Sequence, residues 1–340
     1  MKALTFQRYG KSPGVGFSEL PRPTLQPNQL LVEVHAAAVN PVDNMVMTGT
    51  FKPVLKFDLP ATLGSDLAGI VTEVGSRVTR FKKGDAVFAS VFDQGTGSMA
   101  EFAVVPESAA ALKPANLDFV QAASIPMVGL TSWQALTERA GLQRGQKVFI
   151  PAGSGGVGTF AIQLAKQIGA HVGTTTSTGN VPLVRSLGAD DVVDYKTQEF
   201  ENVLRGYDVV LGTTRGDALE KSVGILSAGG KIVSIVGPLD AAFARARRLN
   251  GLLTFVFGLM SRRVRADEPQ DQAPGQEARC GVFVPVRPPG RRATGQDRRT
   301  ARSRTHPPGH RQGVSVRTGK AGPGLSRARP CQGQGGGGYQ

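Results

Sequence analysis

Hydrophobic and polar residues alternate in short runs over about the first 112 residues. Gly64, Gly69, Gly75 and Gly84 separate these runs, as in a compact β-rich domain with tight corners. Strands are expected at residues 30–39, 68–75, 85–91 and 100–105. A short helix is expected at 118–123 and a second from about 127 to 140.

After Gly145 the pattern changes to apolar strands that alternate with amphipathic helices. Strands are expected at 147–152, 171–176, 191–195, 207–213 and 231–237, and helices at 157–169, 181–188 and 219–230. Such an alternation predicts a parallel sheet covered by helices on both faces. The fold class predicted for the chain is therefore α/β, with a β-rich domain followed by a doubly wound domain.

The periodicity stops near residue 260. Of the net charge of +14, residues 259–340 carry +11, from 16 Lys and Arg against 5 Asp and Glu. This basic segment is rich in Gly, Pro and Arg and has few apolar clusters, so its composition predicts disorder. The first 258 residues are close to neutral, and the charge of the whole chain is therefore no argument for a nucleic-acid partner.

The N-terminal sequence MKALTFQRYG has no apolar run of the kind found in signal peptides. No segment approaches the ~20 apolar residues of a membrane-spanning helix. Both cysteines, Cys280 and Cys331, lie in the basic tail, which leaves the globular part without disulfides or thiolate ligands. These features predict a cytoplasmic protein with no membrane partner.

A glycine-rich loop directly follows the expected strand at 147–152 and directly precedes the helix at 157–169. This context, required of a dinucleotide fingerprint, favours cofactor binding over a purely structural turn. The helix N-terminus would offer N–H groups to a pyrophosphate. The loop residues are Gly153, Ser154, Gly155, Gly156, Val157 and Gly158.

The end of the second expected strand of this domain has no acidic residue. NAD-binding sites place Asp or Glu there to hold the ribose 2′-hydroxyl, whereas hydroxyl and amide groups can donate to a 2′-phosphate. Arg185 either adds positive charge or is a solvated surface residue. The composition of this segment favours NADPH, with Thr175, Thr176, Ser177 and Asn180 as candidate contacts.

Several motifs, in order, resemble the quinone and enone oxidoreductases of the medium-chain dehydrogenase/reductase superfamily. They are NPVD (40–43), LGSDLAGIVTEVGSRVTRFKKGDAVF (63–88), AASIPMVGLTSWQAL (122–136), PAGSGGVG (151–158), YDVV (207–210) and GGKIVSIVGP (229–238). The resemblance covers nearly all of residues 1–260. It implies a GroES-like catalytic domain at 1–125, a Rossmann domain at 126–260 and an active site between them.

The resemblance also implies roles for individual residues. Asn40 would lie near the nicotinamide ribose and the substrate, Thr131 would contact the nicotinamide, and Phe51 would cover the substrate pocket. On the cofactor side, it implies contacts from Tyr195, Gly212, Thr213, Val236 and Gly237. The chain departs from the family after YDVV, where many relatives carry an acidic residue and a glycine pair but this chain reads GTTRG.

Three of these residues have structural alternatives. Asn40 before Pro41 is also typical of a turn. Tyr195 is also typical of an aromatic at a strand end, and Thr131 of a residue that caps or lines a helix.

No metal site is expected. Zinc-dependent relatives take Cys and His ligands from the segments that read NPVDNM and LGSDLAG here, and neither segment contains one. Because no Lewis acid would stabilise an alkoxide, alcohol oxidation is disfavoured. A conjugated carbonyl or quinone delocalises the charge that hydride transfer creates, so hydrogen bonds can replace a metal. The predicted function is NADPH-dependent reduction of an enone, enal or quinone.

Two other classes of function are alternatives. One is an NADPH-binding protein whose catalysis is impaired by the aberrant C-terminus. The other is nucleic-acid binding through the tail, which lacks aromatic interleaving and any known module. The family implies a homodimer, which the altered tail calls into question for this chain.

The tail has the properties of translation in a shifted reading frame. Reading from the second base, the codons allowed for 281–290 include YSFLFVRPD, similar to a late Rossmann strand of the family. Residues 304–313 and 332–339 likewise allow family-like segments. We therefore expect residues 261–340 to be out of frame, and residues from about Asp267 onward to form no native part of the fold.

Overall fold

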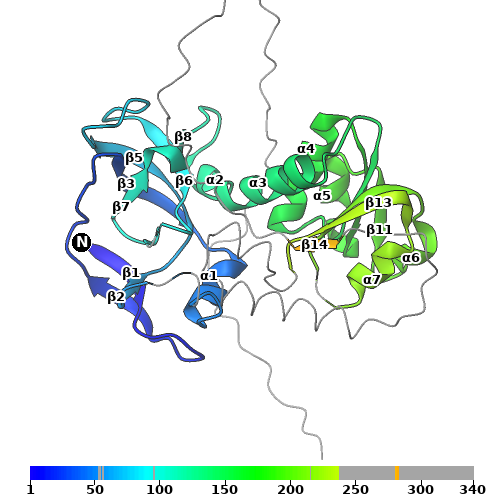
Figure 1. The fold of residues 1–340 in the computed structure, drawn as a ribbon, viewed down its shortest axis with the longest axis horizontal. Coiled ribbons are helices and arrows are strands. Elements are labelled where there is room, and N and C mark those ends of the chain that lie inside the picture. Colours follow the sequence, from blue (N-terminus) through cyan, green and yellow to red (C-terminus); the bar gives the residue numbers. More distant parts are fainter. Residues whose placement is uncertain (53–54, 56, 95, 215, 237–279, 283–340) are drawn as a thin grey trace, which may run out of the picture.

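The computed structural model describes residues 1–52, 55, 57–94, 96–214, 216–236 and 280–282, the last of these as backbone alone. Two domains are visible in Figure 1: a β-rich domain formed by the first part of the chain and an α/β domain that follows it. Helices α2 (Phe119–Ala123) and α3 (Pro126–Trp133) lie between them. The expected α/β class, with a β-rich domain followed by a doubly wound α/β domain, is confirmed.

The first domain is built from two antiparallel sheets. A three-stranded sheet has the order β2 (Val15–Glu19), β1 (Lys2–Phe6), β4 (Ala61–Thr62). A five-stranded sheet has the order β7 (Phe102–Pro106), β3 (Gln29–Ala38), β5 (Asp66–Val74), β6 (Ala86–Ser90), β8 (Ala110–Leu112). The larger sheet contributes to an aliphatic core that includes Leu30, Val32, Leu67, Val71 and Val87. Helix α1 (Pro41–Met47) follows β3, and a 3₁₀ turn, Glu107–Ala109, precedes β8.

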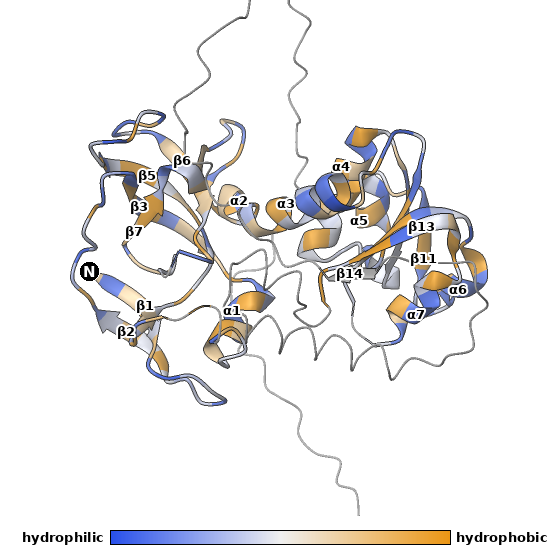
Figure 2. Ribbon diagram, in the orientation of Figure 1, coloured by the Kyte–Doolittle hydropathy of each residue, from blue (hydrophilic) through white to orange (hydrophobic). Residues whose placement is uncertain are grey.

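The second domain contains a parallel sheet with a Rossmann strand order. The order is β11 (Asp191–Asp194), β10 (His171–Thr176), β9 (Lys147–Ile150), β12 (Tyr207–Gly212), β13 (Leu226–Ser234), β14 (Cys280–Val282). The helices are α4 (Gly156–Ile168), α5 (Val181–Ser186), α6 (Phe200–Val203) and α7 (Ala218–Val223), with a 3₁₀ turn at Thr178–Asn180. Gly158, Ala161, Ile162 and Ala165 on one face of α4 are buried, and Figure 2 shows hydrophilic residues elsewhere on this helix.

The structure differs from the sequence prediction at two helices. The prediction of a helix over 219–230 is wrong beyond Val223, because Leu226 already pairs with Tyr207 as the start of β13. The pairing shifts register after Tyr207, and Gly229 has a φ of +78° within the strand. The AGG segment is thus an irregular part of a strand, where glycine accommodates the bend. The helix expected at 127–140 continues past Trp133 as a π-helical segment, Gln134–Arg139.

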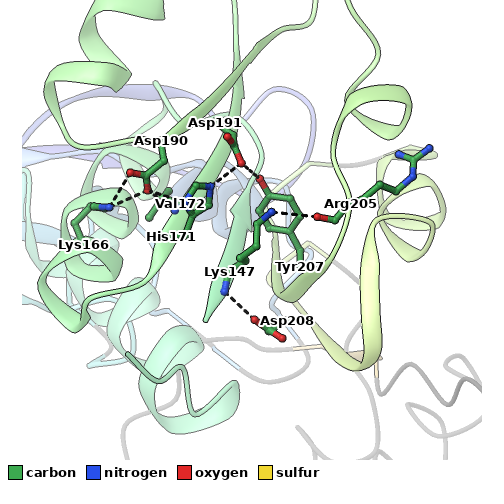
Figure 3. Close-up of polar contacts among 9 residues, drawn as sticks. All are labelled: Lys147, Lys166, His171, Val172, Asp190, Asp191, Arg205, Tyr207 and Asp208. Carbon is green, nitrogen blue, oxygen red and sulfur yellow. Dashed lines mark hydrogen bonds and ion pairs between the residues drawn. The ribbon is translucent and has the colours of Figure 1, made fainter. Parts of the chain in front are cut away.

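A polar network joins the amino ends of the parallel strands (Figure 3). Asp191 Oδ2 lies 2.7 Å from His171 Nε2 and accepts a hydrogen bond of 2.7 Å from the Tyr207 hydroxyl. Lys166 Nζ lies 2.8 Å from Asp190 Oδ2, which also accepts from the main-chain N–H of Val172. This network ties β10, β11 and β12 together at the end of the sheet opposite the glycine loop.

Most of the basic tail lies outside the described residues, as does the boundary expected at residue 260. Three tail residues do belong to the sheet, in contrast to the expectation that nothing beyond Asp267 takes part in the fold. Cys280–Val282 pair in parallel with Ile232, Val233 and Ser234 of β13. They occupy the sixth position of the sheet, at the start of the segment whose shifted frame reads as a family-like strand.

Candidate active site

The glycine loop lies between β9 and α4, and close packing explains its glycines. A Cβ on Gly153 would lie 2.1 Å from Thr174 Oγ1, and one on Gly158 would lie 2.4 Å from the carbonyl oxygen of Ala152. Gly155, the N-cap of α4, is exposed. Ala152, directly before the loop, has a positive φ of 54°, and the sequence did not single out this position. Gly156, the first residue of this 13-residue helix, is exposed as well, and the first N–H groups of a helix have no helical partner, so this end forms a cradle that fits a dinucleotide phosphate.

Hydroxyl and amide groups gather beside this cradle at the carboxyl end of β10. Thr176 Oγ1 lies 3.0 Å from Ser154 Oγ, to which Asn180 Nδ2 also donates at 3.3 Å. Ser177 Oγ accepts from the same amide at 3.3 Å. Thr175 instead is buried, and its Oγ1 accepts from the main-chain N–H of Ala152. The structure therefore brings four of the predicted polar residues together, while Thr175 contacts the loop from its buried side.

The remaining cofactor candidates lie at the same edge of the sheet. Tyr195 is 59% exposed and donates its main-chain N–H to Thr176, so it stands beside the polar cluster rather than in the core. Thr213 Oγ1 donates to the carbonyl of Pro151 at 2.7 Å. Val236 donates its N–H to Ser234 Oγ, and a Cβ on Gly212 would lie 2.5 Å from Leu219 Cδ2. Gly237 lies outside the described residues.

Asn40 lies in a second polar cluster, in the first domain, as the N-cap of α1. Its amide Nδ2 donates to Ser65 Oγ at 2.8 Å and to Asp66 Oδ2 at 3.0 Å. Its main-chain N–H donates to Asp43 Oδ2 at 2.6 Å, and Ser65 Oγ donates to the same oxygen at 3.1 Å. The turn expected of Asn-Pro is present, but the side chain of Asn40 is engaged in a network beyond it.

Asp66 is the functional candidate that sequence reasoning missed. The residue is 1% exposed, Oδ2 accepts from Asn40 and from the Met127 N–H at 3.0 Å, and Oδ1 has no hydrogen-bond partner. Burial raises the pKa of Asp66 to about 6, although its hydrogen bonds act in the opposite direction. Burial likewise raises the pKa of Asp43. The signal in the sequence is an aspartate at the start of an apolar strand, in GSDLAG.

Helix α3 connects this cluster to the glycine loop. At its start, Met127 donates to Asp66; further along, Ser132 Oγ donates to the Val157 carbonyl at 3.4 Å. A Cβ on Gly156 would lie 3.2 Å from Val128 Cγ1. Thr131, on the same helix, is 4% exposed and lies within the span of the helix, so it caps neither end.

Phe51 is buried and packs edge-to-face on Phe92, with ring centroids 5.7 Å apart. Phe92 and Asp43 line a small cavity of about 10 Å³, the size of one water molecule. Phe51 thus forms part of an apolar wall of the first domain beside the Asn40 cluster. The other lining residues are Phe6, Val46, Phe57, Thr62, Leu63, Gly64 and Thr96.

The donors of the Asn40 cluster do not suit zinc, which prefers thiolate, imidazole and carboxylate ligands. Two of the four side chains are an amide and a hydroxyl, and these bind the two carboxylates directly. Within the described part of the chain, no group of three or more His, Cys, Asp or Glu side chains is placed to hold a metal ion.

Two family models match the chain. The Alcohol dehydrogenase GroES-like domain matches residues 26–115, and the Zinc-binding dehydrogenase model matches residues 156–259. The chloroplast envelope quinone oxidoreductase homolog of Arabidopsis thaliana is 39% identical over 249 residues, which are 70% of this chain and 76% of the relative. The chain belongs to the quinone and enone oxidoreductase branch of the medium-chain dehydrogenase/reductase superfamily.

Other members of the superfamily agree with this placement. The chloroplastic NADPH-dependent alkenal/one oxidoreductase of Arabidopsis thaliana is 39% identical over 252 residues, 70% of this chain and 63% of the relative. The structure of the quinone oxidoreductase from Coxiella burnetii has a TM-score of 0.64 and 31% identity, covering 78% of this chain and 88% of that one. As a member of this branch, the chain is an NAD(P)-dependent oxidoreductase that acts on a small molecule.

The location of the protein stays a prediction. No helix in the described residues is long and apolar enough to cross a membrane. The names of several relatives place them in chloroplasts or mitochondria, so the expected cytoplasmic location has no support from these names.

Proposed function

We propose that this oxidoreductase uses NADPH to reduce a conjugated carbonyl compound or a quinone without a metal ion. The observation that carries the proposal is the acid-free cluster of Ser154, Thr176, Ser177 and Asn180 beside the exposed glycine cradle. Each of these side chains can donate to a 2′-phosphate, and none repels it. The names of two relatives, an alkenal/one oxidoreductase and a quinone oxidoreductase, support the substrate class.

One carboxylate lies near this cluster. Asp194, at the end of β11, accepts hydrogen bonds from Thr178 Oγ1 and from the main-chain N–H of Lys196. These bonds lower the pKa of Asp194, so it is ionised at neutral pH. Because it belongs to the neighbouring strand and is held by its own partners, Asp194 does not occupy the position from which an acid selects NAD.

Reduced nicotinamide, when bound, would supply a hydride from its C4 to an electrophilic carbon of the substrate, and the charge displaced onto the conjugated oxygen would be neutralised by a proton from solvent. The chain would contribute orientation and polarity. Ser154, Thr176 and Asn180 would hold the phosphate end of the dinucleotide, and α3 would position Thr131 beside its reactive ring. The apolar wall that contains Phe51 would exclude water from the substrate.

Cofactor affinity tests the first part of the proposal. Fluorescence titration should show NADPH bound at least about tenfold tighter than NADH, equivalent to ~1.4 kcal/mol. Ser177→Asp should remove this preference, because a carboxylate would repel the 2′-phosphate. Ser186→Asp, which adds the same charge at an exposed position at the end of α5, is the matched control and should retain it. Equal affinities in the unmodified chain would refute NADPH selectivity.

A panel of quinones and enones then tests the chemistry by following NADPH oxidation. Turnover of at least one compound, unaffected by chelators, is expected. Tight NADPH binding without turnover of any of them would favour the impaired, cofactor-binding alternative.

A further inference from the structure

The amide of Asn40 has no hydrogen left to offer a ligand. An asparagine amide carries two N–H hydrogens, and in this structure they are directed to Ser65 Oγ and Asp66 Oδ2. Asn40 is only partly buried, and it forms a capping box with Asp43 at the start of α1. A carbonyl oxygen can accept two hydrogen bonds, so Oδ1 keeps capacity beyond the cap. Oδ1 is therefore the group through which Asn40 can meet a bound molecule.

The charge of Asp66 dictates this orientation. An ionised carboxylate only accepts hydrogen bonds, so the amide must turn its nitrogen toward Asp66. A protonated Asp66 could donate instead and would allow the amide to rotate, with Oδ1 turned inward. The orientation of Asn40 thus depends on the ionisation of Asp66, a neighbour that is almost completely buried.

We propose that Asp66 is a positioning residue, whose carboxylate fixes Asn40 as a hydrogen-bond acceptor toward the bound cofactor. This inference rests on the proposed function. An enone or a quinone has only acceptor oxygens, whereas a ribose of the dinucleotide carries hydroxyl donors. The complementary partner of Asn40 is therefore a cofactor hydroxyl and not the substrate oxygen. Asn40 consequently contributes to cofactor binding rather than to stabilising charge on the reduced substrate.

The surroundings of Asp66 define what else could titrate with it. Hydrogen bonds from the Met127 N–H on α3 and from the Asn40 amide lower its pKa, as does the nearby Ser90 hydroxyl on β6, and Asp43 on α1 acts on it as a like charge. Among the described residues, no Lys, Arg or His forms an ion pair with either carboxylate. Asp43 is thus the second titratable group of the cluster. Because Asp66→Asn retains Asp43, its pH profile distinguishes the titration of Asp43 from that of Asp66.

The test measures cofactor affinity against pH with the full-length chain. NADH is the probe, because it lacks the 2′-phosphate, whose own pKa of about 6 would overlap. A carboxyl group with a pKa of about 6 is ~90% ionised at pH 7 and ~10% at pH 5, so affinity should fall about tenfold over this range. Asp66→Asn should bind about tenfold more weakly at pH 7 and show no inflection.

Two further variants keep the result interpretable. Ser65→Ala leaves the amide held by Asp66, so it should lose affinity less than about threefold and retain the inflection. Asp191→Asn, in the distant network of Figure 3, should match the unmodified chain at each pH at which it is folded. Circular dichroism confirms that each variant is folded before titration.

The inference would be overturned by a folded Asp66→Asn with unchanged affinity and pH profile, or by a defect confined to the KM for the quinone. An inflection that persists in Asp66→Asn would assign the titration to Asp43 and also refute it. Failure of the proposed function looks different, because it would abolish turnover of every quinone and enone while leaving the NADH titration readable.

Discussion

Asp66 and Asp191 each accept two hydrogen bonds on Oδ2, yet their surroundings drive their pKa values in opposite directions. Burial alone would raise the pKa of Asp191, but hydrogen bonds from His171 and Tyr207 at the amino edge of the parallel sheet outweigh it, so its pKa lies below the usual value. Asp66 accepts from a neutral amide and a main-chain N–H, and burial raises its pKa to about 6.

The difference between these networks is the presence of cationic or titratable donors. Lys166 pairs with Asp190, and a protonated His171 can pair with Asp191, whereas the carboxylates beside Asn40 have no such partner in the described part of the chain. A carboxylate with matched donors stabilises the fold, while a buried carboxylate without a cation costs stability. We infer that the first network is structural and that the second is retained for what it does to Asn40.

The largest effect is expected where the structural network is most tightly packed. A Cβ on Gly173 would lie 2.2 Å from the Tyr207 hydroxyl oxygen and 2.6 Å from Cζ. Gly173→Ala should therefore lower the free energy of unfolding by about 3 kcal/mol in urea denaturation. Gly16→Ala, where no atom lies within 4 Å of the position that the new methyl group would take, is the matched control and should be nearly neutral. Stability equal to that of the unmodified chain would show that Tyr207 is loosely held.

A smaller loss is expected when the acceptor of this network is removed. Asp191→Ala leaves the hydroxyl of the buried Tyr207 without its partner, at a cost of about 2 kcal/mol. The pKa of Asp191 is lowered by folding, so its contribution is present above the unfolded value near 3.8 and is lost as the pH falls through the folded value. The difference in melting temperature should thus be full at pH 7 and shrink below about pH 4. A loss of cofactor affinity at pH 7 in the folded variant would contradict a purely structural role.

The smallest expected effect has the opposite sign. The folded pKa of Asp66 is raised from 3.8 to about 6, so its ionisation costs stability that grows as the pH rises from 3.8 to 6 and is complete above that. Asp66→Asn should therefore stabilise the chain at pH 8 by about 1 kcal/mol, after the cost of an unpaired amide N–H at the Oδ1 position. Thermal unfolding at pH 8 and pH 4 should show this gain turning into a loss. Destabilisation at pH 8 would place Asp66 with Asp191 as a structural carboxylate.

The fold was predictable because it depends on local periodicity. The run HVGTTT at 171–176, rich in β-branched residues, and a glycine loop before an amphipathic helix specify β10 and α4 with little help from distant contacts. The start of β13 was not predictable in this way. Its first residue, Leu226, pairs with Tyr207, and only this long-range partner distinguishes AGG within a strand from AGG at the end of a helix.

The candidate site likewise has one part that the sequence predicted and one part that it did not. The glycine loop and the hydroxyl cluster lie on adjacent strands whose carboxyl ends meet, so a linear motif describes them well. The Asn40 cluster unites α1, β5 and the start of α3, and Met127 reaches Asp66 across 61 positions of sequence. No linear motif specifies such a carboxylate, because its burial and the absence of a cation beside it arise only when α1, β5 and α3 pack together.

Trp133, the one tryptophan of the chain, ends the helix that joins these two regions. It is 53% exposed, and its neighbour Ser132 contacts the carbonyl of Val157 in the glycine loop. Emission from the unmodified protein under excitation of indole therefore comes from a single point at the end of α3. Reduced nicotinamide absorbs in the range where indole emits, so energy transfer from Trp133 would report the arrival of the cofactor without any added label.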